Sequence, residues 1–177
     1  HWVHSAEMTN MLFLTLERIP QPVVASVRGI AAGGGMALVA AADLAIGADS
    51  AKMFAAQIKL GAIPDSGVSY NMVRSIGLKR AKQLGMLGDT IDAATALDFG
   101  LLNWVVPDDQ LDARTEQLTA RLARTPRTAL ALTKATFNQA WNESLGEHFQ
   151  QEARDVAECV SADDFVQRVR GFVERAR

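Results

Sequence analysis

The chain has 177 residues, of which 49% are hydrophobic, and its 20 acidic and 18 basic residues give a net charge of −2. This composition suits a globular chain with a substantial core, and the mixing of both charge signs leaves no basic face for nucleic acid. We therefore expect a partner of metabolite size. The single cysteine, Cys159, cannot form an intramolecular disulfide, which fits a reducing compartment and favours a cytoplasmic location.

The sequence gives no sign of a membrane segment, a secretion signal or a metal site. Its most apolar stretch, residues 30–42, is shorter than the roughly 18 to 20 residues that a spanning helix needs. The three histidines, at 1, 4 and 148, form no pair with ligand spacing, so we expect no metal. Because the chain begins with His1 and not Met, we expect the natural protein to be longer and this chain alone to be inactive.

The first half of the chain predicts a helix, a buried strand and a second helix. Residues 6–17 place Met8, Leu12 and Leu16 at i, i+4 and i+8, which predicts a helix that turns this stripe toward the core. Residues 23–27 are rich in valine and predict a buried strand.

Three consecutive glycines, Gly33, Gly34 and Gly35, precede the apolar helical segment 36–42. They stand where a helix begins, so unpaired N–H groups and the positive end of the helix dipole are exposed there. Such a turn can bind an anion or a developing oxyanion. A purely structural role, in which the glycines allow close packing of strand and helix, fits the spacing as well.

Other glycine-rich motifs fit this stretch less well. No Lys-Ser or Lys-Thr follows the glycines, which excludes a P-loop, and Leu38 stands where a dinucleotide fingerprint needs Gly or Ala. Ser66 lacks the glycines two positions away on either side that a nucleophile elbow requires.

The rest of the chain predicts short strands among many helices. Asp92 is a predicted N-cap for a helix that Gly100 ends, and Ser161 with Asp164 resembles a capping box that opens the last helix. Strands are predicted over 51–54 and 102–106. Helices are predicted over 69–76 (ended by Gly77), 80–85, 93–97, 108–122 and 126–141, along Leu145 to Val160, and from Ser161 onward.

Together these segments resemble the crotonase (enoyl-CoA hydratase/isomerase) superfamily. The resemblance rests on residues 19–29, 33–35, 43–46, 61–64, 80–82, 88–89, 93–96, 100–103 and 105–107, which follow the family's order. It implies an α/β fold of the crotonase-like (ClpP/crotonase) type. Residues 1–107 would be a partial core, derived from ββα units, whose N-terminal strands are missing. Residues 108–177 would be a helical oligomerisation region that builds a homotrimer or hexamer.

The resemblance also implies a reaction. Family hydratases carry glutamates at the places of Ala37 and Gln57, and neither residue here can transfer a proton as a carboxylate does. Asp65 stands where isomerases of the family place a proton-shuttling aspartate, and Gly34 would donate its N–H to the thioester oxygen. The residues Pro64 to Gly67 also fit a type I turn with no catalytic role.

The expected substrate is therefore an acyl-CoA, with no separate cofactor and no metal. Besides Asp65 and Gly34 as catalytic residues, the resemblance implies these substrate-binding residues: Gly33, Gln57, Ile63, Pro64, Phe172 and Arg175. An isomerase is favoured, and two alternatives stay open. One is another reaction of the family, such as hydration or hydrolysis, and the other is a non-catalytic protein that binds acyl-CoA or oligomerises.

Overall fold

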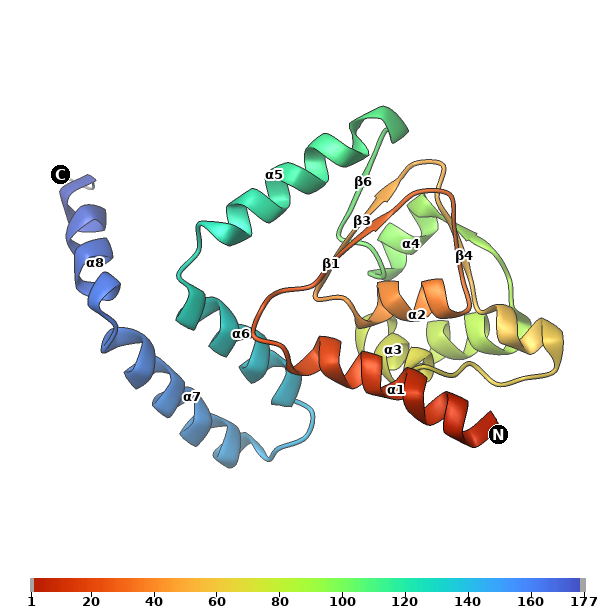
Figure 1. Cartoon of the computed structure of the whole chain (residues 1–177), viewed down its shortest axis with the longest axis horizontal. Helices are drawn as coiled ribbons and strands as arrows, with labels where there is room; N and C mark the ends of the chain where they lie inside the picture. The colour runs from red at the N-terminus through yellow and green to blue at the C-terminus, as the bar shows by residue number, and fades with distance from the viewer. Residues whose placement is uncertain (1, 176–177) are drawn as a thin grey trace. The chain divides into compact units, whose positions relative to one another are not determined.

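The computed structural model of the protein describes residues 2–175 (Figure 1). The chain divides into two compact units, His1–Arg121 and Leu122–Arg177. The boundary falls inside helix α5, Leu111–Ala123, so most of that helix belongs with the first unit. The oligomerisation role of residues 108–177 stays a prediction.

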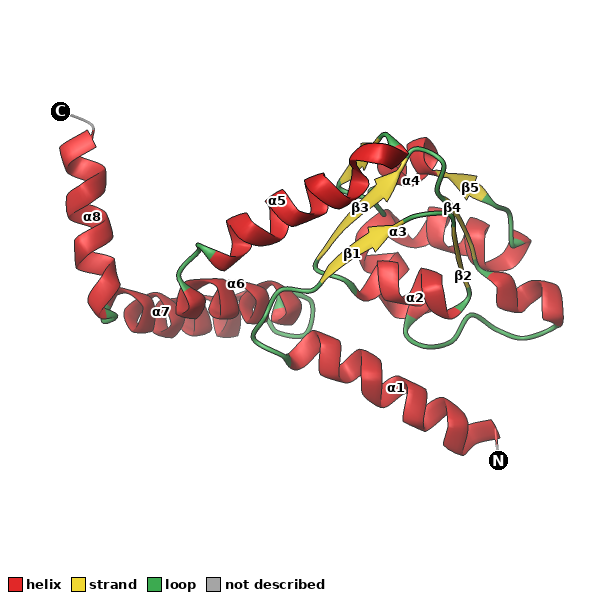
Figure 2. Ribbon diagram, turned by 45° about the horizontal axis from the view of Figure 1, so that its top comes forward, coloured by secondary structure: helices red, strands yellow, loops and turns green. Residues whose placement is uncertain are grey.

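A parallel three-stranded sheet forms one part of the first unit. Its order is β1 (Val24–Val27), β3 (Leu44–Ala48) and β6 (Trp104–Val106), with both neighbouring pairs parallel. Figure 2 shows β1 and β3 running side by side. The strands at 23–27 and 102–106 are thus confirmed. The central strand, β3, is almost wholly buried, as expected where both faces of a parallel sheet are covered.

A second sheet has the order β2 (Ile30–Ala32), β4 (Lys52–Phe54) and β5 (Ile91–Asp92). β2 pairs with β4 in parallel, and β4 pairs with β5 antiparallel. The strand at 51–54 was predicted, whereas β2 and β5 were not. Both are too short to show the alternation of apolar and polar residues by which strands are recognised.

Helix α2, Gly34–Ala41, is the centre of the first unit. It contacts α1, α3, β1 and β2, and Figures 1 and 2 show it between α1 on one side and β1 on the other. Met36 and Ala37 are fully buried, and the helix carries no charged residue. A helix surrounded in this way needs apolar residues on nearly every face, which explains its composition.

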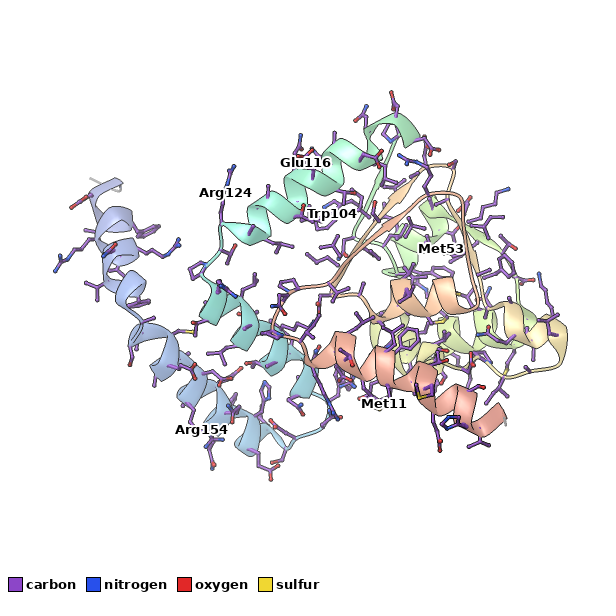
Figure 3. All side chains as sticks on the ribbon, viewed as in Figure 1. Met11, Met53, Trp104, Glu116, Arg124 and Arg154 are labelled. Atoms are coloured by element: carbon purple, nitrogen blue, oxygen red, sulfur yellow. The ribbon has the colours of Figure 1, made fainter. Side chains whose placement is uncertain are left out.

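Helix α1, Trp2–Arg18, does not face the core with the predicted stripe. Met8 and Leu12 are 63% and 50% exposed, whereas Phe13 is buried and Leu16 packs beside it. Figure 3 shows Met11 on the outer side of α1. The helix is confirmed and Leu16 packs on the core as predicted, but the prediction was wrong for Met8 and Leu12, because the buried face of α1 is centred on Phe13.

Helix α3, Val68–Leu87, is interrupted at Gly77, whose φ of 79° and ψ of 159° are not helical. The two predicted helices on either side of Gly77 are therefore confirmed as two segments of one element. Met72 and Leu84, one from each segment, enter the same core as Met53 of β4, which Figure 3 shows among packed side chains.

Helix α4, Ala93–Phe99, has the predicted ends. The Asp92 side chain accepts a hydrogen bond from the Thr95 N–H at 2.8 Å, and Gly100 closes the helix with a φ of 88°. The hydrogen bonds from Thr95 favour the ionised carboxylate and hold the pKa of Asp92 below its ordinary value.

The remaining elements are helical. They are the 3₁₀ helices η1 (Ala56–Leu60) and η2 (Asp108–Gln110), followed by α5, α6 (Arg127–Gln139), α7 (Leu145–Val160) and α8 (Asp163–Arg175). Within the second unit, α7 contacts both α6 and α8. No helix among the described residues is long and apolar enough to cross a membrane.

The predicted capping box at Ser161 was wrong. Ser161 has helical φ and ψ angles, and its hydroxyl donates back to the Ala157 carbonyl at 2.7 Å. The side chain of Asp164 lies outside the described residues. A capping box does form one helix earlier, where Ser144 is extended and exchanges hydrogen bonds with Glu147. The Ser144 hydroxyl, at 2.7 Å, and the Ser144 N–H, at 3.0 Å, both donate to the Glu147 carboxylate and hold the pKa of Glu147 below its ordinary value.

Gly88 ends α3 in a position that tolerates no side chain. Its φ is +65°, and an added Cβ would lie 2.7 Å from Ile58 Cγ2 of η1. We predict that Gly88→Ala lowers the free energy of unfolding by about 1 to 3 kcal/mol, from backbone strain and this clash. Urea unfolding monitored by circular dichroism measures the change.

Gly146→Ala provides the matched control, since no atom lies within 4 Å of its added Cβ and the residue is helical. It should leave stability unchanged or slightly raised. Equal unfolding midpoints for the two variants would show that α3 and η1 do not depend on close packing at Gly88.

Candidate functional site

The three segments that carry predicted site residues meet in the first unit. Gly33 precedes α2, Gln57 lies in η1, and Asp65 follows the Ile63-Pro64 pair. The Gln57 amide lies near both of the others: its Nε2 donates to Asp65 Oδ1 at 2.9 Å and would lie 3.9 Å from a Cβ added to Gly33. The carboxylate and the glycine turn are thus neighbours of the same side chain.

The glycine turn has a backbone that only glycine adopts readily. Gly33 has a φ of 54° and a ψ of −113°, its N–H donates to the Phe54 carbonyl at 3.3 Å, and its carbonyl accepts from the Ala37 N–H at 3.0 Å. Gly34 is the first residue of α2, so its N–H belongs to the first turn, where the helix supplies no acceptor. Gly34 is exposed, and no atom lies within 4 Å of the place of its Cβ. An oxygen of a bound molecule can therefore approach this backbone closely.

Asp65 begins a tight turn that ends at Val68, whose N–H donates to the Asp65 carbonyl at 3.0 Å. The two central residues, Ser66 and Gly67, have φ angles of 55° and 75°. This is the pattern of a type I′ turn over residues 65–68. The type I turn over residues 64–67, which the composition also fitted, is therefore not formed. Ser66 is also buried, and a left-handed non-glycine residue costs about 1 to 3 kcal/mol, as is common at functional sites.

The two polar atoms of the Gln57 side chain differ in their hydrogen bonding. Its Nε2 donates to Asp65, but its Oε1 is buried and has no hydrogen-bond partner among the described residues. A buried acceptor without a donor costs about 1 to 3 kcal/mol. Native proteins hold few such groups, and each calls for an explanation such as a catalytic role.

The other predicted residues divide between the two units. Ala37 is fully buried, and Pro64 packs on α3, where Gly85 leaves room: a Cβ on Gly85 would lie 3.5 Å from Pro64 Cγ. Ile63, by contrast, is 78% exposed. Phe172 lies exposed on α8 in the second unit, and the side chain of Arg175 lies outside the described residues. Their role as CoA contacts stays a prediction.

Two polar residues of the matching motifs have structural roles. Asp43 Oδ2 accepts from the Val23 N–H at 2.7 Å and so joins the end of α2 to the start of β1. Asn103 Oδ1 accepts from the Ala45 N–H at 2.7 Å, and its own N–H donates to the Ala45 carbonyl at 2.8 Å. Across the described part of the chain, no group of three or more His, Cys, Asp or Glu residues could hold a metal.

The link between Gln57 and Asp65 was missed at the level of sequence. Gly61 ends η1 in the left-handed conformation, and the Ala62 N–H then donates to the Gln57 carbonyl at 3.0 Å. This reversal returns the chain past Gln57. A glycine directly after a short helical turn was the available signal, since left-handed helix ends favour glycine.

Comparison with known proteins gives one consistent result. A family model described as Enoyl-CoA hydratase/isomerase matches residues 4–177. The chain is 31% identical to a trans-2-decenoyl-[acyl-carrier-protein] isomerase of Streptococcus mutans, over 99% of this chain and 66% of that protein. It is 38% identical to a 1,2-epoxyphenylacetyl-CoA isomerase of Escherichia coli, over 77% and 52%, and 35% identical to a "probable enoyl-CoA hydratase" of Rhodobacter capsulatus, over 88% and 61%. The chain thus spans between about half and two thirds of these relatives.

Solved structures agree. The crystal structure of an enoyl-CoA hydratase/isomerase from Cupriavidus metallidurans superposes with a TM-score of 0.95 at 29% identity, covering 98% of this chain and 66% of that one. An enoyl-CoA hydratase from Bacillus anthracis gives a TM-score of 0.93 at 30% identity, covering 97% and 67%. The predicted crotonase-type α/β fold is therefore confirmed.

The two glycines of the turn should respond differently to substitution. We predict that Gly33→Ala lowers the free energy of unfolding by about 1 to 3 kcal/mol, because alanine is strained at a φ of 54°. Gly34→Ala should be neutral or stabilising, since Gly34 is helical and its Cβ would meet open space. Thermal unfolding of both variants tests this, and equal losses would show that the turn has another conformation.

Proposed function

The chain belongs to the enoyl-CoA hydratase/isomerase family, and we propose that the protein is an acyl-CoA isomerase of that family. The observation that carries this proposal is the pairing of one carboxylate, Asp65, with the uncharged amide of Gln57 beside the glycine turn. In the stretch 23–67 the other carboxylates are Asp43, which binds the Val23 N–H, and Asp49, which lies exposed after β3. Asp65 is thus the group of this stretch that can transfer protons beside the turn.

The proposed reaction moves a double bond along an enoyl or ring acyl-CoA thioester. Asp65 removes a proton from a carbon conjugated with the thioester, the C–H electron pair enters the conjugated system, and negative charge develops on the thioester oxygen. The Gly34 N–H stabilises that charge, together with a second donor from outside this chain. Asp65 then returns the proton to another carbon, which restores both the thioester and the carboxylate.

Hydration is the second candidate, favoured by the relatives whose names contain hydratase. Adding water to a double bond needs one group to activate the water and one to protonate carbon, which two carboxyl groups can provide. Here Ala37 is an apolar, fully buried residue and Gln57 carries an amide. One carboxylate suffices for a proton shuttle, so isomerisation is the better match.

The proposal extends to assembly and location. The exposed apolar residues along α7 and α8, among them Leu145, Phe149, Val156 and Phe172, support a homotrimer or hexamer. CoA enters as part of the substrate, and proton transfer needs no further cofactor. We place the protein in the cytoplasm as part of the same proposal.

Asp65→Asn tests the reaction most directly. In the full-length protein we predict that this change lowers isomerase turnover by about a hundred- to ten-thousandfold, the usual contribution of a general base. The asparagine Oδ1 can still accept from Gln57, so the fold and acyl-CoA binding should be kept. Mass spectrometry of the products measures turnover, and solvent deuterium exchange into the substrate should fall in parallel.

Asp49→Asn is the matched control, because the same change at an exposed position should leave turnover intact. If Asp65→Asn keeps both turnover and exchange, the base is a different residue. A product heavier by one water would instead identify a hydratase.

Gly34→Val tests the oxyanion role. The branched side chain would fill the open space at Gly34 and obstruct a thioester oxygen, so we predict a loss of about a hundredfold or more in kcat/KM. Gln167→Ala on the exposed part of α8 should have little effect. Unchanged turnover in Gly34→Val would leave the glycine turn with a structural role alone.

A further inference from the structure

We propose that Gln57 positions Asp65. Its amide occupies the carboxylate oxygen Oδ1 with a hydrogen bond, so that the other oxygen, Oδ2, is the atom that takes up and returns the proton. This inference rests on the proposed isomerase function. It adds to that function a role for an amide that cannot itself transfer protons.

The orientation of the Gln57 amide follows from chemistry. An ionised carboxylate has only acceptors, so the amide nitrogen and not its oxygen must face Asp65 Oδ1 at 2.9 Å. A proton on Oδ1 would set an O–H donor against the N–H donor and weaken this hydrogen bond. The bond therefore favours protonation at Oδ2, which Gln57 leaves unoccupied.

The backbone that carries the Gln57 amide is held in place. The amide itself lies near Gly33, where an added Cβ would be 3.9 Å from Nε2 and 4.0 Å from Cδ. The Gln57 carbonyl accepts from the Ala62 N–H at 3.0 Å, and the neighbouring Ile58 packs closely on Gly88. A side chain held in this way transfers its own orientation to the carboxyl group that it binds.

The state of Gln57 Oε1 distinguishes a positioning role for Gln57 from one that only stabilises the fold. The amide gains one bond to Asp65, but among the described residues its Oε1 is buried without a donor. A side chain selected for stability alone would be better apolar at this position, because an apolar group of similar size leaves no acceptor unsatisfied. An unfavourable group kept beside a proposed catalytic carboxylate is the pattern expected where function opposes stability.

Gln57→Met in the full-length protein tests the proposal, since methionine has a similar length and neither a donor nor a strong acceptor. We expect kcat to fall by about ten- to a hundredfold, the range of one hydrogen bond to a charged group. KM should stay within about twofold, and the urea midpoint should be unchanged or higher. Gln83→Met, an exposed position on α3, is the control for the substitution itself.

A second measurement reports on the carboxyl group directly. In D₂O, a carboxyl that Gln57 no longer orients can rotate and exchange its proton with solvent before returning it. We therefore expect more deuterium per product molecule in Gln57→Met than in the wild type.

The outcomes separate this inference from the proposed function. Full turnover in Gln57→Met, with Asp65→Asn inactive, would overturn the inference alone. A loss of turnover in Gln57→Met that accompanies a lower urea midpoint, with unchanged deuterium content, would also overturn it, because Gln57 would then only brace the fold. Full turnover in Asp65→Asn would overturn the proposed function.

Discussion

The burial of α2 is the constraint on which the rest of the first unit depends. Met36, Ala37 and Val39 lie in the core, and the helix contacts α1, α3 and both sheets. A helix enclosed on so many sides cannot shift without opening the core, so the position of its first residues is fixed as well. The glycine turn is thereby a rigid feature, although Gly34 itself is exposed. Rigid placement is what a donor needs if it is to stabilise charge without reorganising.

Residues with a left-handed backbone conformation then bring the segment that carries Asp65 near the glycine turn. Gly61 reverses the chain after η1, and Ser66 with Gly67 reverses it again before α3. Between these reversals lie Ile63, Pro64 and Asp65. These backbone reversals thus determine where the carboxylate lies, and the Gln57 amide donates a hydrogen bond to it.

The features that the sequence predicted well are local ones. Asp92 and Gly100 define α4, and Gly77 divides α3, because caps and helix breaks depend on one residue and its immediate neighbours. Ser144 and Ser161 show the limit of such patterns, since both precede an acidic residue by three positions and only the extended Ser144 forms the box. The face of α1 and the hydrogen bond between Gln57 and Asp65 depend on tertiary packing, which no local pattern contains. The family motifs named the candidate residues, but the hydrogen bond between Gln57 and Asp65 became visible only in three dimensions.

Ser66 has a consequence for the mutational tolerance of the turn. Its left-handed φ of 55° excludes most side chains, and its burial at 6% exposure excludes asparagine and aspartate, which the backbone would otherwise accept. Apart from the serine present, glycine is the residue that satisfies both conditions, and it would place two glycines in succession at residues 66 and 67. A Ser66→Gly substitution would increase the conformational freedom of the backbone beside Asp65. The serine therefore restricts the backbone conformations open to a turn that begins at Asp65, and its replacement by glycine would widen them.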